Sequence, residues 1–519
     1  MSTVEPPAQS AFRKKLIGLL AALLVPPVGI VLLWLPPFQP GLLRRFGEAA
    51  TRLVLSGALI VLTILYGTSL GLFHVEMSGG GWSKPIFSLG DPDDDQDALE
   101  SHRKELPPLP PAVSIVTPKP EAPTSAPQPK TRAVGPSWID FRGPNRDGNY
   151  HDGPILTSFP EGTPRLLWRQ PIGGGYASFV IANGRAFTIE QRRNREVVVA
   201  YDVPTGREIW SHGWEALFSE VMGGDGPRAT PVWDSGRIYA LGAAGEFVVL
   251  EAETGARVWS KNILADNNAE NVYWGMSNAP LIIGDKVIVT PGGAGGRSIV
   301  AYNKHSGQRI WGSLDDRAAY TSPMLLTLAG APQIVVATAT RIVGVSPDDG
   351  KLLWDFPWVT MQGINSAQPI ATDPNHLFVS AGYDHGSVLL EITAASEGLT
   401  ARPVWESKSL KNRFNSSVLY DNHIYGFDEG IFACIDAETG ERKWKGGRYG
   451  YGQALLAGDH ILVLTEAGDV VILKATPQAH QEVASFPAIE GKTWNHPAIA
   501  GGILLVRNAR EMAAFQVGP

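Results

Sequence analysis

The sequence predicts an all-β fold, an eight-bladed β-propeller, behind an N-terminal helical membrane anchor. The first observation is a glycine followed four residues later by a tryptophan, which occurs five times. The five glycines lie 49, 52, 43 and 90 residues apart, and 90 is close to two periods. A repeat of that length is typical of one propeller blade. The five pairs are Gly206 and Trp210, Gly255 and Trp259, Gly307 and Trp311, Gly350 and Trp354, and Gly440 and Trp444.

The second observation is a tight turn between two short runs rich in β-branched residues, and it occurs eight times. Gly, Asn and Asp supply the positive φ that such turns need. A third run follows each turn, and the tryptophan marks a fourth, so each repeat predicts four strands. The eight turns are Asn183-Gly184, Ser235-Gly236, Gly284-Asp285, Gly330-Ala331-Pro332, Asp373-Pro374-Asn375, Asp421-Asn422, Gly458-Asp459 and Gly501-Gly502.

The last repeat lacks its fourth strand, since the chain stops at Pro519. A strand around Trp168 precedes the first complete repeat, and we expect it to complete the last blade and close the ring. The propeller is thus predicted over residues 138–519. Blade five reaches Trp405 after an insertion, and blade seven carries Phe486 in place of tryptophan. The tryptophans are expected to pack between adjacent blades.

The runs Ala200–Trp210 and Ile435–Trp444 each end in Thr-Gly-x-x-x-Trp after an aspartate. This pattern resembles the PQQ-like, quinoprotein-type propeller repeat. The segment Trp138–Gly148 also looks like the start of uncharacterised bacterial PQQ-binding-like repeat proteins. The resemblance implies the quinoprotein alcohol dehydrogenase-like fold. The group contains PQQ-dependent dehydrogenases and also the cofactor-free propeller subunit of the outer-membrane β-barrel assembly machinery, so the fold does not decide the function.

Residues 1–77 are predicted to be a membrane anchor with two apolar helical segments, at about 16–35 and 53–73, each long enough to cross a bilayer. A cleaved signal peptide is the alternative for the first segment. A simple two-span hairpin would leave the propeller in the cytoplasm. Proline pairs interrupt and end the first segment, and if it re-enters, all the nearby basic residues stay inside. We therefore expect a bacterial inner-membrane protein with its propeller facing the periplasm.

Residues 78–137 are predicted to be a disordered linker, acidic at first and then Pro-rich, with ten prolines between Pro107 and Pro136. The formal net charge of the chain is −7, and no basic stripe is present, which argues against a nucleic-acid partner. Cys434 is the single cysteine, so no internal disulfide forms. It stands in an apolar run and is expected to be a small core residue.

The candidate ligand site is one mouth of the central channel. The innermost strand of each blade starts there, so the residues just before these strands are expected to ring it with amides, hydroxyls and aromatic rings. The alternative is that these groups only satisfy one another and ordered water. The residues are Arg228, Trp274, Ser277, Asn278, Tyr320, Thr321, Asn365, Asn415, Ser416, Tyr451, Gln453, Trp494 and Asn495.

Two functions follow, and the first is a membrane-anchored, non-catalytic binding or scaffold module for protein partners or a small ligand, without cofactor or metal. The second is a quinoprotein dehydrogenase that oxidises an alcohol or sugar with PQQ and calcium. For that enzyme the resemblance implies Asn278 or Asn365 as a metal ligand and Asp315 or Asp316 as a base. It also implies Arg228 near the quinone and Trp274 beneath it. The chain lacks both the paired cysteines of the alcohol dehydrogenases and a c-type haem motif.

Overall fold

The computed structural model describes residues 45–69, 73–77, 85–89, 92–105, 133–220, 223–396 and 398–519. These residues form two compact units. The first unit contains helix α3 (Arg45–Ser69), most of strand β1 (Phe73–Met77) and strand β2 (Pro85–Leu89), with β1 and β2 paired in a two-stranded sheet. The second unit contains the larger part of helix α4 (Pro92–Glu105) and all described residues from 133 onward.

Helix α3 covers most of the second predicted apolar segment, whereas residues 16–35 lie outside the described residues. None of the helices in the described ranges combines the length and the apolarity that crossing a bilayer requires, so the predicted transmembrane helices find no support here. Helix α4 lies within the segment expected to be a linker. Acidic residues fill its first turn and His102, Arg103 and Lys104 its last, an order that complements the helix dipole. Residues 106–132 lie outside the described part.

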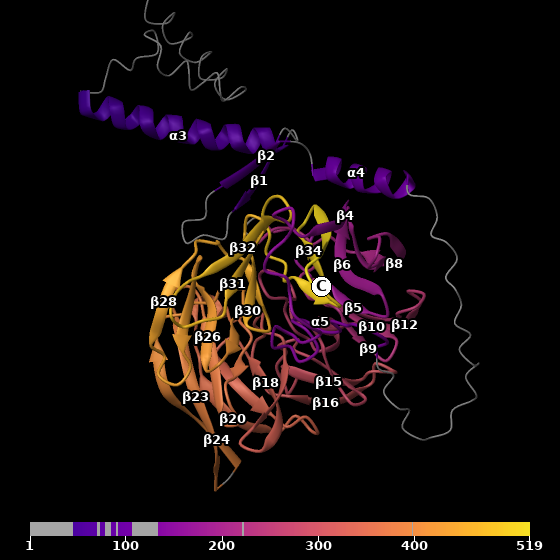
Figure 1. Cartoon of the computed structure of the whole chain (residues 1–519), viewed down its shortest axis with the longest axis vertical. Helices are drawn as coiled ribbons and strands as arrows, with labels where there is room; N and C mark the ends of the chain where they lie inside the picture. Colours follow the sequence, from indigo (N-terminus) through magenta and orange to yellow (C-terminus); the bar gives the residue numbers. More distant parts are fainter. Residues whose placement is uncertain are drawn as a thin grey trace, which may run out of the picture. The chain divides into compact units, whose positions relative to one another are not determined.

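The second unit is the predicted eight-bladed propeller, and its blades follow one another around a ring in chain order (Figure 1). Blade one contains β5 (Val180–Ala182), β6 (Arg185–Arg192), β7 (Arg195–Asp202) and β8 (Glu208–Glu215), and blade two contains β9 (Val232–Asp234), β10 (Arg237–Leu241), β11 (Glu246–Glu251) and β12 (Arg257–Asn262). Blade three contains β13 (Leu281–Ile283), β14 (Lys286–Val289), β15 (Ile299–Asn303) and β16 (Arg309–Ser313). Blade four contains β17 (Met324–Leu328), β18 (Ala331–Ala337), β19 (Arg341–Val345) and β20 (Leu352–Pro357).

Blades five to eight complete the ring. They are β21 (Ile370–Ala371), β22 (His376–Ala381), β23 (Gly386–Ala395) and β24 (Gly398–Ser407); β25 (Val418–Tyr420), β26 (His423–Asp428), β27 (Ile431–Asp436) and β28 (Arg442–Gly446); β29 (Gln453–Ala457), β30 (His460–Leu464), β31 (Asp469–Lys474) and β32 (Glu482–Pro487); and β33 (Ala498–Ala500), β34 (Ile503–Arg507) and β35 (Glu511–Gln516) with β4 (Arg165–Pro171). Short helices α5 (Ile263–Asp266) and η2 (Met361–Gly363) lie in connecting loops.

The ring closes as predicted, because β4 pairs with β35 and places Trp168 opposite Ala514 in the eighth blade. A second tie reinforces this closure. Arg507, from β34 of the same blade, donates to Thr188 Oγ1 at 2.9 Å and to the Gly173 carbonyl at 2.8 Å in the first blade. Its side chain is only 1% exposed. The two ends of the propeller are therefore joined both by a sheet and by a buried arginine.

The Gly-Trp repeat is an interlock between neighbouring blades. A Cβ added to Gly255 would lie 2.6 Å from the ring of Trp210, which belongs to the preceding blade. The Trp210 indole N–H also donates to the carbonyl of Ala252 in the same turn, at 3.1 Å. The same contact recurs around the ring with Gly206, Gly307, Gly350 and Gly440, whose added Cβ atoms would meet the rings of Trp168, Trp259, Trp311 and Trp405. Glycine is required there both by positive φ and by the ring above it.

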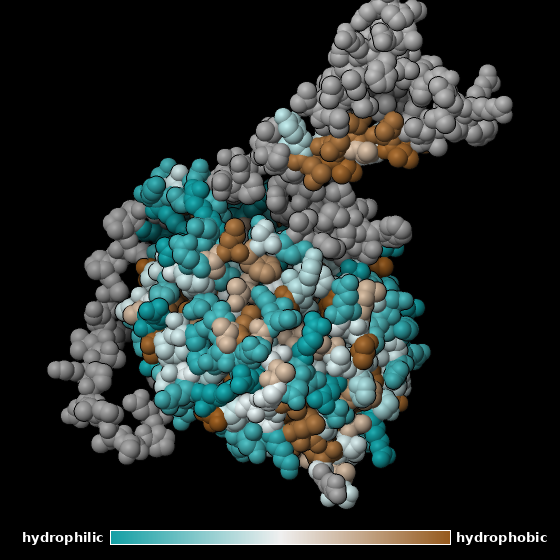
Figure 2. All heavy atoms as spheres, turned by 180° about the vertical axis from the view of Figure 1, so that it is seen from behind, coloured by the Kyte–Doolittle hydropathy of each residue, from teal (hydrophilic) through white to brown (hydrophobic). Residues whose placement is uncertain are grey.

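The two irregular blades also match the prediction. In blade seven, Phe486 is buried and contacts Phe515 of the next blade, with ring centroids 5.3 Å apart. In blade five, β23 and β24 form a longer hairpin before Trp405. Trp354 differs from the other tryptophans because its indole donates to Gln333 within its own blade. The surface of the propeller seen in Figure 2 is mainly hydrophilic, with small, separate hydrophobic patches.

Residues 138–150 cross the central channel, and we call them the channel plug. Trp138 bridges to Ile181 of β5, and β3 (Asn149–Tyr150) pairs in parallel with β29. Arg146 forms an ion pair with Asp140 at 2.8 Å and donates to the Pro323 carbonyl at 2.7 Å. These contacts join the innermost parts of blades that are far apart in the ring. The channel plug thus fixes the geometry of the cavity above it.

Candidate functional site

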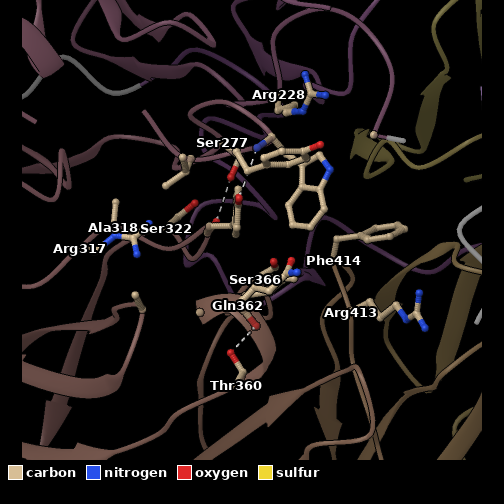
Figure 3. Close-up of a pocket in the computed structure, with 18 of the residues that line it drawn as sticks. Arg228, Ser277, Arg317, Ala318, Ser322, Thr360, Gln362, Ser366, Arg413 and Phe414 are labelled. Atoms are coloured by element: carbon tan, nitrogen blue, oxygen red, sulfur yellow. Dashed lines mark hydrogen bonds between the residues drawn. The ribbon is translucent and has the colours of Figure 1, made fainter. Parts of the chain in front are cut away.

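A cavity of about 1410 Å³ opens on one face of the propeller, at the end where each fourth strand leads into the next blade. We call this end the loop face. The walls of the cavity come from the loops of several blades, and Phe141 of the channel plug contributes to its lining (Figure 3). The Thr-Gly turns of the repeat lie at the opposite ends of the antiparallel strands. The cavity therefore lies at the end of the ring where the innermost strands begin.

The predicted site residues divide into two groups. Six line the cavity, and they are Arg228, Trp274, Ser277, Tyr320, Gln453 and Trp494. The other seven lie outside its lining, and they are Asn278, Thr321, Asn365, Asn415, Ser416, Tyr451 and Asn495. The division follows the alternation of side chains along extended chain. Ser277 lines the cavity and Asn278 is buried behind it, just as Tyr320 lines it and Thr321 is buried.

The buried asparagines tie neighbouring blades together. Asn278 donates from its amide to the Thr321 carbonyl at 2.6 Å, and Asn495 donates to the Ala177 carbonyl at 3.0 Å. Asn365 donates to the Thr338 carbonyl at 2.7 Å. Each bond joins a loop to the adjoining blade, so these amides hold the ring together behind the cavity wall. The backbone carbonyls that they bind would otherwise be buried without a donor.

Polar residues just before the innermost strands form a second set of ties. The Ser322 amide donates to Gln368 Oε1 at 3.0 Å, and the Gln368 amide donates in turn to Ser416 Oγ at 3.0 Å. The Ser178 amide donates to Thr230 Oγ1 at 3.0 Å. Each side chain therefore caps an amide in the preceding blade.

One wall of the cavity is built from aromatic rings in tilted contact with one another. The centroids of Trp494 and Phe414 lie 4.5 Å apart, and those of Trp494 and Tyr176 lie 5.4 Å apart. Trp274 and Tyr320 form a second pair at 5.7 Å. The Trp494 indole N–H donates to Glu466 at 2.9 Å, which fixes the orientation of the ring. Such a wall offers flat apolar surface to an occupant.

Four arginines line the cavity, and two of them are neutralised by carboxylates. Arg341 forms two hydrogen bonds to Asp316, both 2.7 Å long. Arg413 forms an ion pair with Glu429 at 2.8 Å and lies over the ring of Tyr383, 4.5 Å from its centroid. Both side chains are therefore held in place by the protein itself.

The other two arginines, Arg228 and Arg317, form no ion pair with a carboxylate among the described residues, although Glu220 and Asp225 lie near Arg228. The Arg228 guanidinium donates to the carbonyls of Gly224 and Gly226 and lies 4.6 Å from the centroid of the Phe218 ring. Burial lowers the pKa of Arg228, although Tyr176, Glu220 and Asp225 act in the opposite direction. Arg317 is exposed, and its side chain forms no hydrogen bond or ion pair with any residue that the structure describes. Arg228, Arg317 and Arg413 lie on three sides of the cavity in Figure 3.

Three residues of the cavity lining have a strained backbone. Leu314, Gln362 and Tyr383 have φ angles of 62°, 56° and 55°, in the left-handed region that few non-glycine residues adopt. Such outliers occur frequently at ligand sites, where the surrounding structure maintains them. Sequence reasoning missed these residues, and it also missed Arg317, Arg413 and Phe414. The last two stand directly before Asn415, in the same loop position that the prediction used, and reading two residues further back would have included them.

The donor set of a quinoprotein centre was tested against these side chains, and it does not fit. Such a centre needs a carboxylate and an amide oxygen directed at one metal ion. Asp316 is occupied by Arg341, and Asp315 accepts from the Gly296 amide at 2.8 Å. Asn278 and Asn365 donate their Nδ2 atoms to carbonyls of neighbouring blades, and their Oδ1 atoms, although buried without a partner, belong to residues outside the cavity lining. No three His, Cys, Asp or Glu side chains within the described ranges are grouped as a metal would require.

Comparison with known proteins agrees with the fold. A family model described as outer membrane protein assembly factor BamB matches residues 194–446. The chain is 21% identical to BamB of Bordetella pertussis over 315 residues, which cover 58% of this chain and 72% of that protein. It is 31% identical to the quinohemoprotein alcohol dehydrogenase ADH-IIG of Pseudomonas putida over 263 residues, which cover 48% of this chain and only 29% of that enzyme.

Among solved structures, a europium-containing methanol dehydrogenase superimposes with a TM-score of 0.54 and 13% identity, over 72% of this chain and 89% of that one. At that identity the likeness concerns the fold alone. The repeat pattern, the family match and the superposition nevertheless agree with one another. The chain thus has an eight-bladed propeller with PQQ-like, quinoprotein-type repeats, and it resembles both BamB and the quinoprotein dehydrogenases.

Proposed function

We propose that this propeller is a non-catalytic binding module that receives a protein partner at the cavity on its loop face. The observation that carries the proposal is the state of the cavity's polar groups. Its carboxylates Asp315 and Asp316 accept hydrogen bonds from the protein itself, whereas cationic, aromatic and amide groups remain at its surface. Such a lining offers recognition without a paired acid and base placed for chemistry.

The rim of the cavity supports a protein as the partner. Tyr273, Val359 and Met361 are 68%, 65% and 60% exposed, and all three line the opening. Single apolar residues are common on protein surfaces, but several around one opening favour contact with another macromolecule. The relatives named BamB are assembly factors by name, which agrees with a role in binding protein.

The binding function is tested by site-specific photo-crosslinking of the full-length chain in cells. A photoreactive amino acid replaces Met361 at the rim, and a matched variant carries it at Glu253, which is exposed in a Thr-Gly turn at the opposite end of the strands. We expect a discrete crosslinked product from position 361 and none from position 253. Equal products, or none from the rim, would contradict the proposal.

The quinoprotein dehydrogenase is the second candidate, and the similarity to ADH-IIG favours it. Titration calorimetry of the full-length chain with PQQ, with and without calcium, separates the two. We expect no binding at high micromolar PQQ, because the carboxylates of the cavity are already bonded. Tight calcium-dependent binding would instead support the enzyme and call for a screen of alcohols and sugars.

We further propose that the module is attached to the bacterial inner membrane and faces the periplasm. The support is the pair of apolar runs in the sequence and the exposed leucines and valines of α3, of which Leu53, Val54 and Leu65 are 67%, 72% and 59% exposed. A C-terminal alkaline phosphatase fusion tests the side, since that enzyme is active only in the periplasm. An inactive fusion would place the propeller in the cytoplasm.

A further inference from the structure

We infer that the cavity binds an acidic segment of a partner polypeptide, recognised through Arg228 and Arg317. This inference rests on the proposed binding function and deepens it by naming the chemistry of the occupant. Its first support is the charge of the lining, which holds four arginines and two aspartates. Arg341 and Asp316 neutralise each other, so the remaining side chains of the lining carry a surplus of positive charge.

The two arginines without a carboxylate partner supply that surplus. Arg228 donates its hydrogen bonds to the neutral carbonyls of Gly224 and Gly226, and no ion pair to a carboxylate is formed within the described residues. Glu220 and Asp225 lie near it and offset part of its charge, so Arg317 supplies the larger share of the available positive charge. Arg317 keeps all its guanidinium donors available toward the opening, as far as the described residues show. A carboxylate is the group that a free guanidinium binds most strongly in a peptide.

The polar side chains between these arginines suit a peptide backbone. Gln362 and Ser366 lie in the middle of the cavity in Figure 3, and within the described chain neither side chain forms a hydrogen bond. An amide and a hydroxyl can each donate and accept, which matches the alternating N–H and C=O groups of an extended chain. Both residues follow Thr360, whose hydroxyl donates to the Ile364 carbonyl at 3.0 Å and holds the loop in shape.

The size of the cavity favours a polypeptide over a small anion. Pockets for small ligands usually measure about 300–1,000 Å³, and this one is larger at about 1410 Å³. Its exposed rim residues Tyr273, Val359 and Met361 extend the contact beyond the opening, where only a longer occupant reaches them. We therefore expect the segment to carry apolar side chains beside its acidic ones.

The overall charge of the chain does not itself attract an acidic peptide. With a formal net charge of −7 the protein as a whole repels acidic ligands. The potential of the cavity extends only over about one Debye length, roughly 8 Å in physiological salt. A preference for acidic peptides therefore has to arise from the cavity itself.

Fluorescence anisotropy of the full-length protein with a short labelled peptide tests the inference. The probe alternates Asp or Glu with Leu or Phe, and its matched control replaces every acid by the amide. We expect the acidic peptide to bind at least about tenfold more tightly than the amide peptide. Arg317→Glu should weaken binding of the acidic peptide about tenfold or more, whereas Arg317→Lys, which keeps the charge but loses the planar fork of donors, should weaken it less than Arg317→Glu does.

Arg297→Glu is the matched control, because Arg297 lies in a neighbouring loop outside the cavity lining and the charge change is the same. It should alter the affinity by less than about twofold. Equal binding of the two peptides, or equal effects of the two variants, would overturn the inference. Binding of free succinate as tight as that of the peptide would also overturn it, because the site would then be one for small anions.

The crosslinking described above separates this inference from the proposed function. If position 361 still crosslinks to a partner while the acidic peptide fails to bind, the module binds a protein by other chemistry and only the inference is wrong. If neither crosslinking nor peptide binding occurs, the binding function itself is wrong.

Discussion

Arginines are present both in the channel plug and in the cavity above it, and they differ in what their donors do. Arg146 of the plug is 3% exposed, is paired with Asp140 and binds carbonyls of two blades. Arg317 of the cavity is exposed and binds none of the residues that the structure describes. The plug arginine is thus part of the fold, because its contacts already use its charge. The cavity arginine is available for an occupant. Substitutions in the channel plug and in the cavity can therefore test this difference.

The largest expected effect is at the plug. Arg146→Met should lower the free energy of unfolding by about 3–5 kcal/mol, because it leaves the Asp140 carboxylate buried without its cation. Urea unfolding followed by tryptophan fluorescence measures the change. The double variant Asp140→Asn with Arg146→Met removes the orphaned charge and should recover part of the loss. A loss below about 1 kcal/mol would show that the plug contributes little to the ring.

The interlock between blades should give the next effect. Gly255→Ala forces a Cβ to within 2.6 Å of the Trp210 ring at a φ of 72°, and we expect a loss of about 2–4 kcal/mol. Gly236 in the same blade is the control, since its φ is 81° but no atom lies within 4 Å of an added Cβ. Gly236→Ala should cost only about 1 kcal/mol, the backbone strain alone. Equal losses would mean that the tryptophan contact has no part in the repeat.

This interlock explains why the fold could be predicted from the sequence. The contact between Gly255 and Trp210 needs one residue type at each position, and it returns with every blade. The spacing of these glycines and tryptophans therefore shows the length of one blade in the sequence itself. Ring closure was predictable for the same reason, since the missing tryptophan strand appears around Trp168.

The site was predicted only in part, because it depends on which way each loop side chain points. Trp494 and Asn495 are neighbours in sequence, yet one lines the cavity and the other donates to the next blade. Both are large or polar residues before the same strand, and residue type does not reveal which faces inward. Arg317 was missed because its loop carries no repeated signal. Its environment is set by loops from other blades, which the sequence does not place relative to one another.

A smaller effect on stability is expected from the buried carboxylate Glu190 of the first blade. Burial raises the pKa of Glu190, but Arg192, Arg103 and Arg507 outweigh it and hold that pKa at about 2. The ionised carboxylate therefore stabilises the fold above its ordinary pKa, and this stability is lost as the pH falls toward 2. Glu190→Gln should cost about 2 kcal/mol at neutral pH. The loss should shrink steadily in acid, as measured by urea unfolding at a series of pH values.

Glu196 on the adjacent strand is the contrasting control. Burial raises its pKa, and only the Ala243 amide, at 2.9 Å, and weaker groups oppose this. Its contribution is therefore complete in acid and declines as the pH rises through the folded pKa. Glu196→Gln should be neutral in acid and stabilising by about 1 kcal/mol at neutral pH. The same pH profile for both variants would contradict this assignment of the two carboxylates.

The smallest expected effect on stability is in the cavity. Arg317→Ser should change the free energy of unfolding by less than about 0.5 kcal/mol, because no contact within the described residues depends on that side chain. Arg413→Ser, in the same cavity, should be clearly destabilising, since it removes the ion pair to Glu429 and the contact with the Tyr383 ring. Thermal unfolding of the two variants compares them directly. If Arg317→Ser destabilised as much as Arg413→Ser, Arg317 would belong to the fold in the same way as Arg146, and the cavity would lose its available charge. If Arg317 is kept for an occupant, its substitution should leave the free energy of unfolding unchanged. A side chain that contributes nothing to the stability of its own fold has all its hydrogen-bond donors available for a partner.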